Sequence, residues 1–477
     1  MHDPEAYRLT QIVPSERQVC HQQTEFYAFI HFTVNTFTDR EWGDGTESPE
    51  VFQPTELDAR QWVREIRQAG MKGLILTCKH HDGFCLWPSR LTSHSVASSP
   101  YKNGHGDVVR EVSDACREAG LRFGIYLSPW DRNSALYGEG KPYDDYFVGQ
   151  LTELLTGYGP IFSVWFDGAC GEGPQGKKQY YDWDRYYQTV RSLQPMACIS
   201  VCGPDVRWCG NEAGDTRDAE WSVVPKRTAD TEKVASASQH EDQAEFRQRK
   251  ISAKDRDLGS REMLKDEHDL IWYPAEVNTS IRPGWFWHES ENSQVRPLTE
   301  LISIYEHSVG GNATFLLNIP PDRRGLLHEQ DVQRLHEFGD WIRRSFTRNL
   351  LQQYSISCHA SSVAPDSQPE YALTSDSEAF WMAEEEQAVF TADWHVMERV
   401  THIVLSENIR CSQRIEQFCI DLLTEHGWKE IAAHETVGYK YICPVASVSA
   451  SAVRIRIHKS RLAPTLSFVG VYSDCTP

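Results

Sequence analysis

The chain lacks the cysteine patterns of metal-binding and disulfide-stapled proteins. Its 13 cysteines are an odd number, and no two of them form a C-x-x-C pair. Several lie inside apolar runs, as Cys78 and Cys202 do. Such scattered cysteines are typical of buried free thiols in a reducing compartment.

Long apolar runs and positive charge are also scarce. No apolar run approaches the length of a membrane span, and the N-terminus has no apolar core of the signal-peptide type. The net charge of -20 repels the phosphate backbone, so we expect no nucleic-acid partner and no membrane partner. For the sequence as given we expect a cytoplasmic protein, or a secreted one if a leader has been removed.

The sequence up to residue 346 alternates between short apolar runs and helical patterns. The runs of strand length are 26–32, 73–81, 122–130, 161–168, 197–203, 269–277 and 313–321. This alternation is typical of a parallel sheet covered by helices. Over this length it predicts an α/β fold, a (β/α)8-like barrel with an irregular second half. The alternative is a doubly wound open sheet, which the lack of a G-x-G-x-x-G motif after the first strand disfavours.

Two aspartates mark predicted helix starts between these strands. Asp58 precedes the pattern at 59–70 and Asp107 precedes the one at 108–120, and both patterns end on glycine. An aspartate at the N-cap accepts backbone N–H bonds, and glycine is the preferred residue at a helix end. Further helical patterns cover 146–159, 183–195, 299–312 and 329–346.

One segment interrupts the alternation of strands and helices. Residues 225–268 are polar and highly charged. We expect an exposed excursion here, a loop with some helix.

The pattern changes to a period of two after residue 346. Val453, Ile455 and Ile457 alternate with basic side chains, as they would on a strand with one buried face. We therefore predict a catalytic barrel over 1–346 and a C-terminal all-β sandwich over 347–477.

The stretch CKHHDGFC offers two cysteines and two histidines within eight residues. A zinc site needs four converging ligands. His80 and His81 are adjacent, and adjacent side chains on a strand point to opposite faces. We therefore expect no metal site here, and the rest of the chain predicts no cofactor.

Polar and aromatic side chains gather where the predicted strands end, which is where the active sites of (β/α)8 barrels form. They are His31, His80, His81, Tyr126, Trp130, Asp131, Trp165, Asp167, Arg207, Trp208, Asn211, Glu212, Arg282, Trp285 and Trp287. Sugar hydroxyls need charged or amide partners, and sugar C–H faces pack on aromatic rings, so this mixture predicts a sugar pocket. Each residue alone could have a structural role, as Asp167 before Gly168 could have in a turn. Their shared position at the strand ends favours a common functional role instead.

Two of these carboxylates suit glycoside hydrolysis. That reaction needs one ionised carboxylate and one that holds a proton at the working pH. Asp167 directly follows an apolar run, where a charge must find a partner. Asp167 and Glu212 are the predicted pair, and Glu276, at the end of the next predicted strand, is the alternative acid. A retaining mechanism predicts that the carboxyl groups lie about 5–5.5 Å apart.

Six stretches between residues 20 and 345 resemble a known family. They are FIHFTVNTFTDREWGDG, LTCKHHDGFCLWPS, GIYLSPWD, VWFDGA, WCGNEAG and WYPAEVNTSIRPGWFWH. The paired histidines followed by D-G-F and W-x-S, combined with W-F-D-G, resemble the retaining α-L-fucosidases of glycoside hydrolase family 29. The resemblance implies a (β/α)8-like barrel followed by a β-sandwich.

The same resemblance implies roles for individual residues. Asp167 would be the nucleophile, and Glu212 in the G-N-E loop would be the acid/base, as in the subgroup that prefers α-1,3 and α-1,4 linkages. The position of the acid/base is less regular in the broader-specificity subgroup, so Glu276 stays the alternative. The implied fucose pocket consists of His31, Glu41, Trp42, His80, His81, Tyr126, Trp165 and Trp285.

The expected function is a retaining exo-α-L-fucosidase that releases α-1,3/1,4-linked fucose from branched, Lewis-type glycans, with a fucosylated oligosaccharide as its partner. The alternatives are a broad-specificity fucosidase, a lectin-like protein that binds fucose without cleaving it, and another exo-glycosidase on the same barrel. Residues 347–477 look like a discoidin-type carbohydrate-binding sandwich, whose role is either sugar binding or packing support for the barrel.

Overall fold

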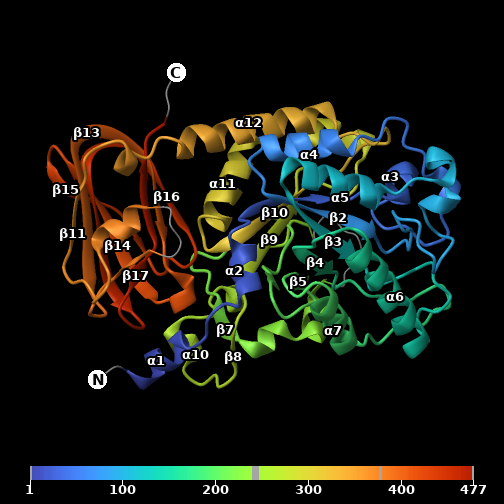
Figure 1. Ribbon diagram of the computed structural model, residues 1–477, viewed down its shortest axis with the longest axis horizontal. Coiled ribbons are helices and arrows are strands. Elements are labelled where there is room, and N and C mark those ends of the chain that lie inside the picture. The colour runs from blue at the N-terminus through green and yellow to red at the C-terminus, as the bar shows by residue number, and fades with distance from the viewer. Residues whose placement is uncertain (1–2, 239–246, 375–378, 475–477) are drawn as a thin grey trace.

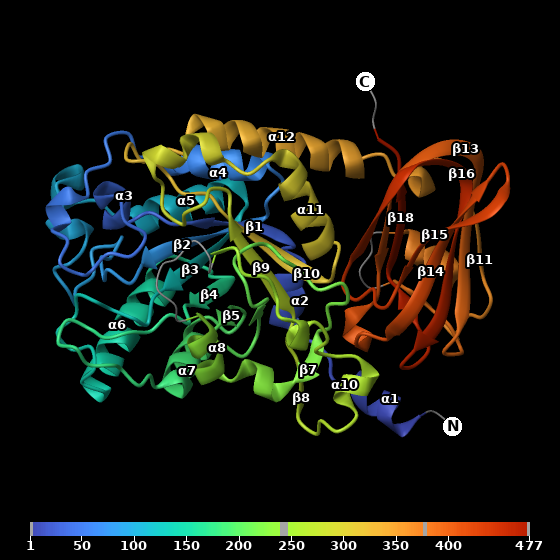
Figure 2. The ribbon, with the colours of Figure 1, turned by 180° about the vertical axis from the view of Figure 1, so that it is seen from behind.

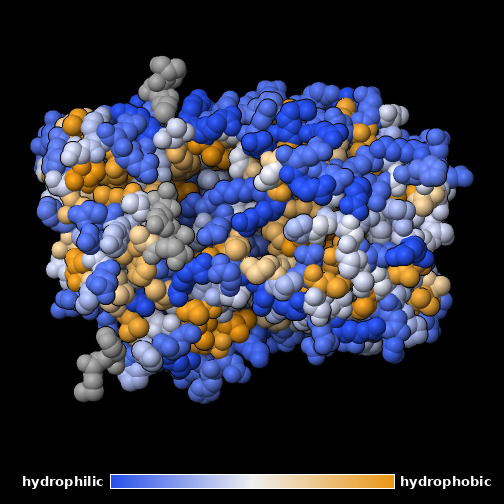
Figure 3. Space-filling model, in the orientation of Figure 1, coloured by the Kyte–Doolittle hydropathy of each residue, from blue (hydrophilic) through white to orange (hydrophobic). Residues whose placement is uncertain are grey.

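A barrel and a β-sandwich lie side by side along the long axis of the molecule (Figure 1). The computed structural model describes residues 3–238, 247–374 and 379–474. No helix of these residues is both long and apolar enough to cross a membrane. The face shown in Figure 3 is mostly hydrophilic, with scattered hydrophobic patches.

The barrel sheet has eight parallel strands among the described residues, in the order β5-β4-β3-β2-β1-β10-β9-β6. Their bounds are β1 Phe26–Ile30, β2 Gly73–Lys79, β3 Arg122–Leu127, β4 Ser163–Phe166, β5 Cys198–Val201, β6 Arg207–Trp208, β9 Ala275–Ser280 and β10 Ala313–Asn318. A bridge between Ser200 and Val206 joins β5 to β6 and leaves the barrel nearly closed. The predicted (β/α)8-like barrel is confirmed.

The helices of the described residues are α1 Pro4–Thr10, α2 Glu16–Gln22, α3 Val34–Thr38, α4 Ala59–Gln68, α5 Val108–Ala119, α6 Lys141–Gly157, α7 Trp183–Leu193, α8 Thr231–Ser238, α10 Arg261–Leu264, α11 Leu298–Ser308 and α12 Glu329–Phe346. The six helices predicted with bounds, α4, α5, α6, α7, α11 and α12, begin and end within about five residues of the predicted positions, and the sequence did not predict α1, α2 or α3. The Asp58 side chain accepts the N–H groups of Arg60 and Gln61, and Asp107 accepts that of Arg110. Both predicted N-caps are therefore confirmed.

The predicted strand 269–277 is wrong as a single element. β8 (Leu270–Trp272) pairs antiparallel with β7 (Val223–Pro225) outside the barrel, and the barrel strand β9 begins at Ala275. Pro274 stands between the two strands, where its lack of an N–H group interrupts the ladder. The sequence did not predict β6 because a strand of two residues carries no periodic pattern.

Alternation along the strands sets which side chains enter the barrel. An inner cluster collects Tyr27, Phe29, Ile75, Tyr126, Trp165, Val201 and Leu316. Their strand neighbours, such as Val164 and Phe166 on β4, pack outward against the helices. Because Trp165 points inward, Asp167 two residues later turns to the same side, just beyond the end of β4.

The C-terminal part forms the predicted antiparallel sandwich (Figure 2). Its strands are β11 Ser357–Ala360, β12 Trp381–Met382, β13 Ala388–Ser406, β14 Ile415–Thr424, β15 Gly427–His434, β16 Tyr441–Ser460, β17 Thr465–Leu466 and β18 Phe468–Tyr472. The larger sheet runs β11-β13-β16-β14-β15, with β18 also paired to β13. Val453, Ile455 and Ile457 are buried, as their spacing predicts. The domain limits at 346 and 347 stay a prediction.

The charged excursion 225–268 is irregular where it is described. It contains α8, α10 and two short 3-10 turns, and it buries Ile251 and Leu264. Residues 239–246 lie outside the described residues. Helix α10 lies beside α1 at the edge nearest the sandwich in both ribbon views (Figures 1 and 2).

A buried ion pair ties the end of β9 to helix α12 and gives a test of the fold. Arg282 Nε donates to Asp331 Oδ2 at 2.8 Å, and both side chains are 0% exposed. Asp331→Ala leaves a buried guanidinium without its carboxylate, so we expect the free energy of unfolding to fall by ~3–5 kcal/mol in chemical denaturation. The matched control is Glu118→Ala, which breaks the exposed Arg60–Glu118 pair of 2.9 Å and should leave the free energy of unfolding nearly unchanged, because solvent screens an exposed pair. Equal small losses for the two variants would contradict this account.

Candidate active site

A cavity opens at the carboxyl ends of the barrel strands. It brings together nine of the predicted site residues: His31, Glu41, Trp42, His80, His81, Trp165, Asp167, Glu212 and Trp285. Trp208, one of the strand-end residues, also lines it. Tyr126 and Glu276 lie outside the lining. The cavity therefore joins segments from residue 29 to residue 285 of the chain.

Asp167 is held by two hydrogen bonds at the start of the loop after β4. The Tyr126 hydroxyl donates to Asp167 Oδ2 at 2.8 Å, and the Ala169 N–H donates to Asp167 Oδ1 at 2.8 Å. His81 Nε2 lies 3.7 Å from Asp167 Oδ2, and the carboxylate is 20% exposed. Tyr126 thus contributes to the site by positioning Asp167 from below. A carboxylate with this support stays oriented toward the cavity.

Glu212 lies in the loop after β6, two strands around the barrel from β4. Trp285 Nε1 donates to Glu212 Oε2 at 3.0 Å, and the Thr279 hydroxyl donates to the Glu212 carbonyl at 2.7 Å. Burial raises the pKa of Glu212 to about 7, and the nearby negative charge of Asp167 acts in the same direction. Glu212 is therefore the carboxyl group in the cavity that can hold a proton near neutral pH.

Glu276 sits inside the barrel beneath the cavity and is 0% exposed. Tyr27 donates its hydroxyl to Glu276 Oε2, and Trp165 Nε1 donates to Glu276 Oε1 at 2.7 Å. Burial also raises the pKa of Glu276 to about 7. Both of its oxygens are engaged by residues of the barrel interior, one of which, Trp165, forms part of the cavity wall. Glu276 therefore supports the wall.

His31 and His81 present hydrogen-bond acceptors to the cavity. Ser128 spends its single hydroxyl proton on the Trp130 carbonyl at 2.7 Å, so His81 Nδ1 must donate to Ser128 Oγ at 2.8 Å. Asn318 uses its amide protons elsewhere, so His31 Nδ1 donates to Asn318 Oδ1 at 2.8 Å. Burial lowers the pKa of each histidine to about 4. Both rings are neutral at pH 7, with Nε2 as a bare acceptor.

His80 and His81 do not point to opposite faces, so the premise used against a metal site is wrong. Strand β2 ends at Lys79, and both imidazoles turn into the cavity with ring centroids 4.1 Å apart. Within the described ranges no group of three or more His, Cys, Asp or Glu side chains has a metal-binding arrangement.

A turn that follows β9 closes one side of the cavity and is held by Glu41. The N–H groups of Trp285 and Phe286 donate to Glu41 at 2.8 and 3.0 Å, and His288 Nε2 donates to Glu41 Oε1 at 2.8 Å. The hydrogen bond to Glu41 raises the pKa of His288 to about 9, so the ring is cationic at pH 7. A Cβ atom on Gly284 would lie 2.5 Å from Glu41 Oε1. Only glycine lets the turn approach this closely.

The charged excursion supplies another side of the cavity. Ser238 at the end of α8 and Arg247 both line it, and Arg247 Nη1 lies 3.6 Å from Glu41 Oε2. A Cβ atom on Gly168 would lie 2.5 Å from Ser238 Oγ, so α8 packs directly on the loop that follows Asp167.

Other strand-end residues have structural roles. Asp131 pairs with Lys79 at 3.0 Å, and both are buried. Arg207 pairs with Glu220, and Arg282 pairs with Asp331. The shared position at one end of the barrel predicted that all strand-end residues face the cavity. Asp131, Arg207 and Arg282 do not line it.

The sequence missed six lining residues. They are Phe29, Ala169, Val201, Ser238, Arg247 and Asn278. Phe29 and Asn278 carry the inward parity of β1 and β9, so counting back two residues from His31 and forward two from Glu276 would have found them. Ser238 and Arg247 carry no such signal, because the path of a long irregular segment does not follow from its composition.

Comparison with known proteins agrees with this geometry. The family model described as Alpha-L-fucosidase matches residues 10–345. Alpha-L-fucosidase 1 of Arabidopsis thaliana is 39% identical over 475 residues, covering 97% of this chain and 88% of that protein.

Two solved structures share the fold across both parts of the chain. A glycoside hydrolase 29 family member from an unknown rumen bacterium has a TM-score of 0.78 and 35% identity, covering 98% of this chain and 78% of that chain. A Ruminococcus gnavus GH29 fucosidase in complex with fucose has a TM-score of 0.83 and 28% identity, covering 97% and 95%. The match of the family model to the whole barrel and the near full-length curated relative show that this chain belongs to the α-L-fucosidases of glycoside hydrolase family 29.

Proposed function

We propose that the chain is a retaining exo-α-L-fucosidase that releases terminal α-1,3/1,4-linked L-fucose from branched, Lewis-type glycans. One observation carries the proposal: the aromatic-walled cavity contains one fully hydrogen-bonded carboxylate, Asp167, and one carboxyl group, Glu212, whose pKa burial raises to about 7. Double displacement needs this division between a nucleophile and a proton donor.

In the first step an Asp167 oxygen attacks the anomeric carbon, and the bond from that carbon to the glycosidic oxygen breaks. Glu212 gives its proton to the departing oxygen, which leaves a fucosyl ester on Asp167 and a Glu212 carboxylate. In the second step Glu212 takes a proton from water, whose oxygen attacks the same carbon and frees Asp167. The configuration is inverted twice and so retained. This mechanism predicts a carboxyl separation of about 5–5.5 Å.

The neutral histidines suit a sugar ligand. Nε2 of His31 and of His81 accept hydrogen bonds, so each pairs with a sugar hydroxyl that donates. The rings of Phe29 and Trp165 offer an apolar wall to the C6 methyl group, which favours a deoxy sugar modestly. The R. gnavus relative was solved with fucose bound, which supports the same ligand here.

Glu212 is a better candidate for the acid/base than Glu276. Glu212 lines the cavity, whereas Glu276 lies beneath it with both oxygens occupied. A group that transfers a proton must reach the glycosidic oxygen within ~2.6–3.2 Å. The position of Glu276 therefore favours a fucosidase restricted to α-1,3/1,4 linkages, with Glu212 as acid/base, over a broad-specificity fucosidase with Glu276 in that role.

We also propose that the chain works as a catalytic barrel over 1–346 and a discoidin-like sandwich over 347–477. Two hydrophobic clusters support this division: one lies wholly within 347–477, and the other consists mainly of barrel residues, joined by Val404, Ile442 and Tyr472 of the sandwich.

Removing the nucleophile should stop hydrolysis and spare binding. We expect Asp167→Asn to lower kcat for fucose release by about 10³-fold or more, because the amide cannot form the ester intermediate. Fucose binding, measured by calorimetry, should persist. The matched control is Glu276→Gln, which should keep at least about a tenth of the activity. Full activity in Asp167→Asn would refute the assignment.

The pH profile should report Glu212. The acid must be protonated, so kcat/KM should fall as the pH rises through about 7, the pKa to which burial raises Glu212. As the pH falls through about 4, His31 and His81 gain protons, lose their acceptor nitrogens and weaken sugar binding. Glu212→Gln should abolish the alkaline limb for an activated aryl fucoside. Persistence of that limb in Glu212→Gln and its loss in Glu276→Gln would reverse the assignment.

Linkage is tested with two substrates scored side by side for free fucose. A Lewis-type trisaccharide carries branched α-1,3 or α-1,4 fucose, and 2′-fucosyllactose carries α-1,2 fucose. We expect the first to be cleaved at least about 100-fold faster, a difference of about 2.7 kcal/mol in transition-state binding. Equal rates would assign the chain to the broad-specificity group.

A further inference from the structure

The loop that carries Glu212 is bracketed by two arginines that share one buried carboxylate. Arg207 on β6 precedes the loop and donates to Glu220 Oε1, and Arg217 follows it and donates to Glu220 Oε2 at 3.0 Å. The three residues are 4–5% exposed. A buried carboxylate with two charge-assisted partners fixes their relative positions, so Glu220 holds both ends of the loop.

The loop backbone is also tied internally around Glu212. Arg217 Nη1 donates to the Cys209 carbonyl at 3.2 Å. Asn211 Oδ1 accepts the N–H groups of Ala213 and Asp215, both at 3.0 Å. A displacement of Glu220 is therefore passed to the backbone on both sides of Glu212.

Glu220 itself is held by the sandwich. Gln413, just before β14, is 0% exposed, and its Oε1 accepts the Ser222 N–H at 2.8 Å. Gln413 Nε2 donates to the Glu220 carbonyl at 3.2 Å and to Thr436 Oγ1 at 2.6 Å. The Gln413 side chain of the sandwich therefore forms hydrogen bonds to the backbone on both sides of Trp221.

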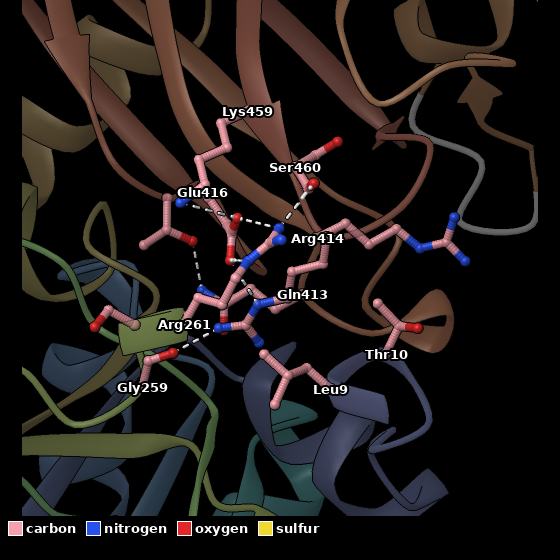
Figure 4. A network of polar contacts seen from close by, with 12 residues as sticks. Leu9, Thr10, Gly259, Arg261, Gln413, Arg414, Glu416, Lys459 and Ser460 are labelled. Carbon is pink, nitrogen blue, oxygen red and sulfur yellow. Dashed lines mark hydrogen bonds and ion pairs between the residues drawn. The ribbon is translucent and has the colours of Figure 1, made fainter. Parts of the chain in front are cut away.

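A second contact clamps the same segment. The Arg461 guanidinium lies 4.5 Å from the centre of the Trp221 ring, and Arg461 also donates to the Gly259 carbonyl at 2.5 Å. Glu416 joins Arg461 to Arg261 of the excursion, with an Arg261–Glu416 distance of 2.7 Å. Figure 4 shows Gly259, Arg261, Gln413 and Glu416 where the sandwich strands meet the excursion and the N-terminal helix.

We propose that the C-terminal sandwich positions the Glu212 loop, with Gln413 and Glu220 as the positioning residues that connect them. The inference rests on the proposed function, because it takes Glu212 as the acid/base. It assigns the sandwich a part in catalysis that requires no sugar bound to it.

The consequence is a loss that depends on the leaving group. A sugar leaving group needs a proton from Glu212, whereas a nitrophenolate leaves with little protonation. An acid displaced by about 1 Å loses up to ~10²-fold in rate with the first kind of substrate. A merely structural defect would lower the rates for both substrates alike.

The test compares kcat/KM for a Lewis-type trisaccharide and for nitrophenyl α-L-fucoside, because kcat/KM reports the first step alone and not the Glu212-dependent hydrolysis that both substrates share. Gln413→Met keeps the side-chain volume roughly constant and leaves the Ser222 N–H unpaired. It also removes one of the two donors to the Glu220 carbonyl, which keeps its bond from Asn312 Nδ2 at 2.8 Å. We expect about 10- to 100-fold loss on the trisaccharide and less than about 3-fold loss on the aryl fucoside.

The matched control is His402→Met, a buried side chain of the sandwich that contacts Glu306 of α11 at 3.2 Å, away from the loop. It should change both rates by the same factor.

Thermal melting of each variant separates misfolding from mispositioning. A folded Gln413→Met that loses both activities in parallel, or neither, overturns the inference. If that variant does not fold, Glu220→Gln takes its place, since it keeps the backbone contact to Gln413 and removes the charge that holds the two arginines. The same selective loss supports the inference, and a parallel loss overturns it. A wild-type chain inactive on both substrates would instead overturn the proposed function, and this inference with it.

Discussion

The site depends on the cost of placing carboxylates among aromatic rings. Each such group is given hydrogen-bond donors, and many of those donors belong to the aromatic residues themselves. Tyr126 holds Asp167, while Trp285 serves Glu41 through its backbone and Glu212 through its indole. The number and kind of donors then set the proton affinity, because donors stabilise the charged form and burial opposes it. For Glu212 the effect of burial prevails, which suits this residue to the role of proton donor that we propose for it.

Much of this site could be predicted because parity on a strand is a local property. The inward position of Trp165 fixes the direction of Asp167, and the same count places His31 above Phe29. The sequence did not show which of two glutamates faces the cavity, because Glu212 follows one barrel strand and Glu276 lies on another. Their difference lies in partners from β1 and β4, which are distant in sequence.

What the sequence did not predict depended on chain paths rather than on periodicity. The run at 269–277 reads as one strand, yet Pro274 divides it between two sheets. The predicted strand 73–81 includes His80 and His81, whereas β2 ends at Lys79. Arg247 reaches the cavity from a segment whose composition suggests only exposure to solvent. Tertiary contacts decide all three cases, and a local pattern does not contain them.

The two sides of the cavity are built in different ways. The Asp167 side rests on ordinary barrel strands and their helices, so its geometry is fixed by hydrophobic packing. The Glu212 side follows a two-residue strand and an irregular segment, and its geometry is fixed by buried polar contacts. Such contacts are directional and fix the position of Glu212 accurately, but each buried polar group is costly to leave without its partner.

Gly284 and Glu41 restrict how this pocket can be redesigned. They are distant in the chain, yet a single added carbon atom at 284 would overlap the carboxylate at 41. A substitution at either position alone would disrupt the turn that carries Trp285. Positions 41 and 284 must therefore be changed together, and a side chain at 284 requires a shorter residue at 41.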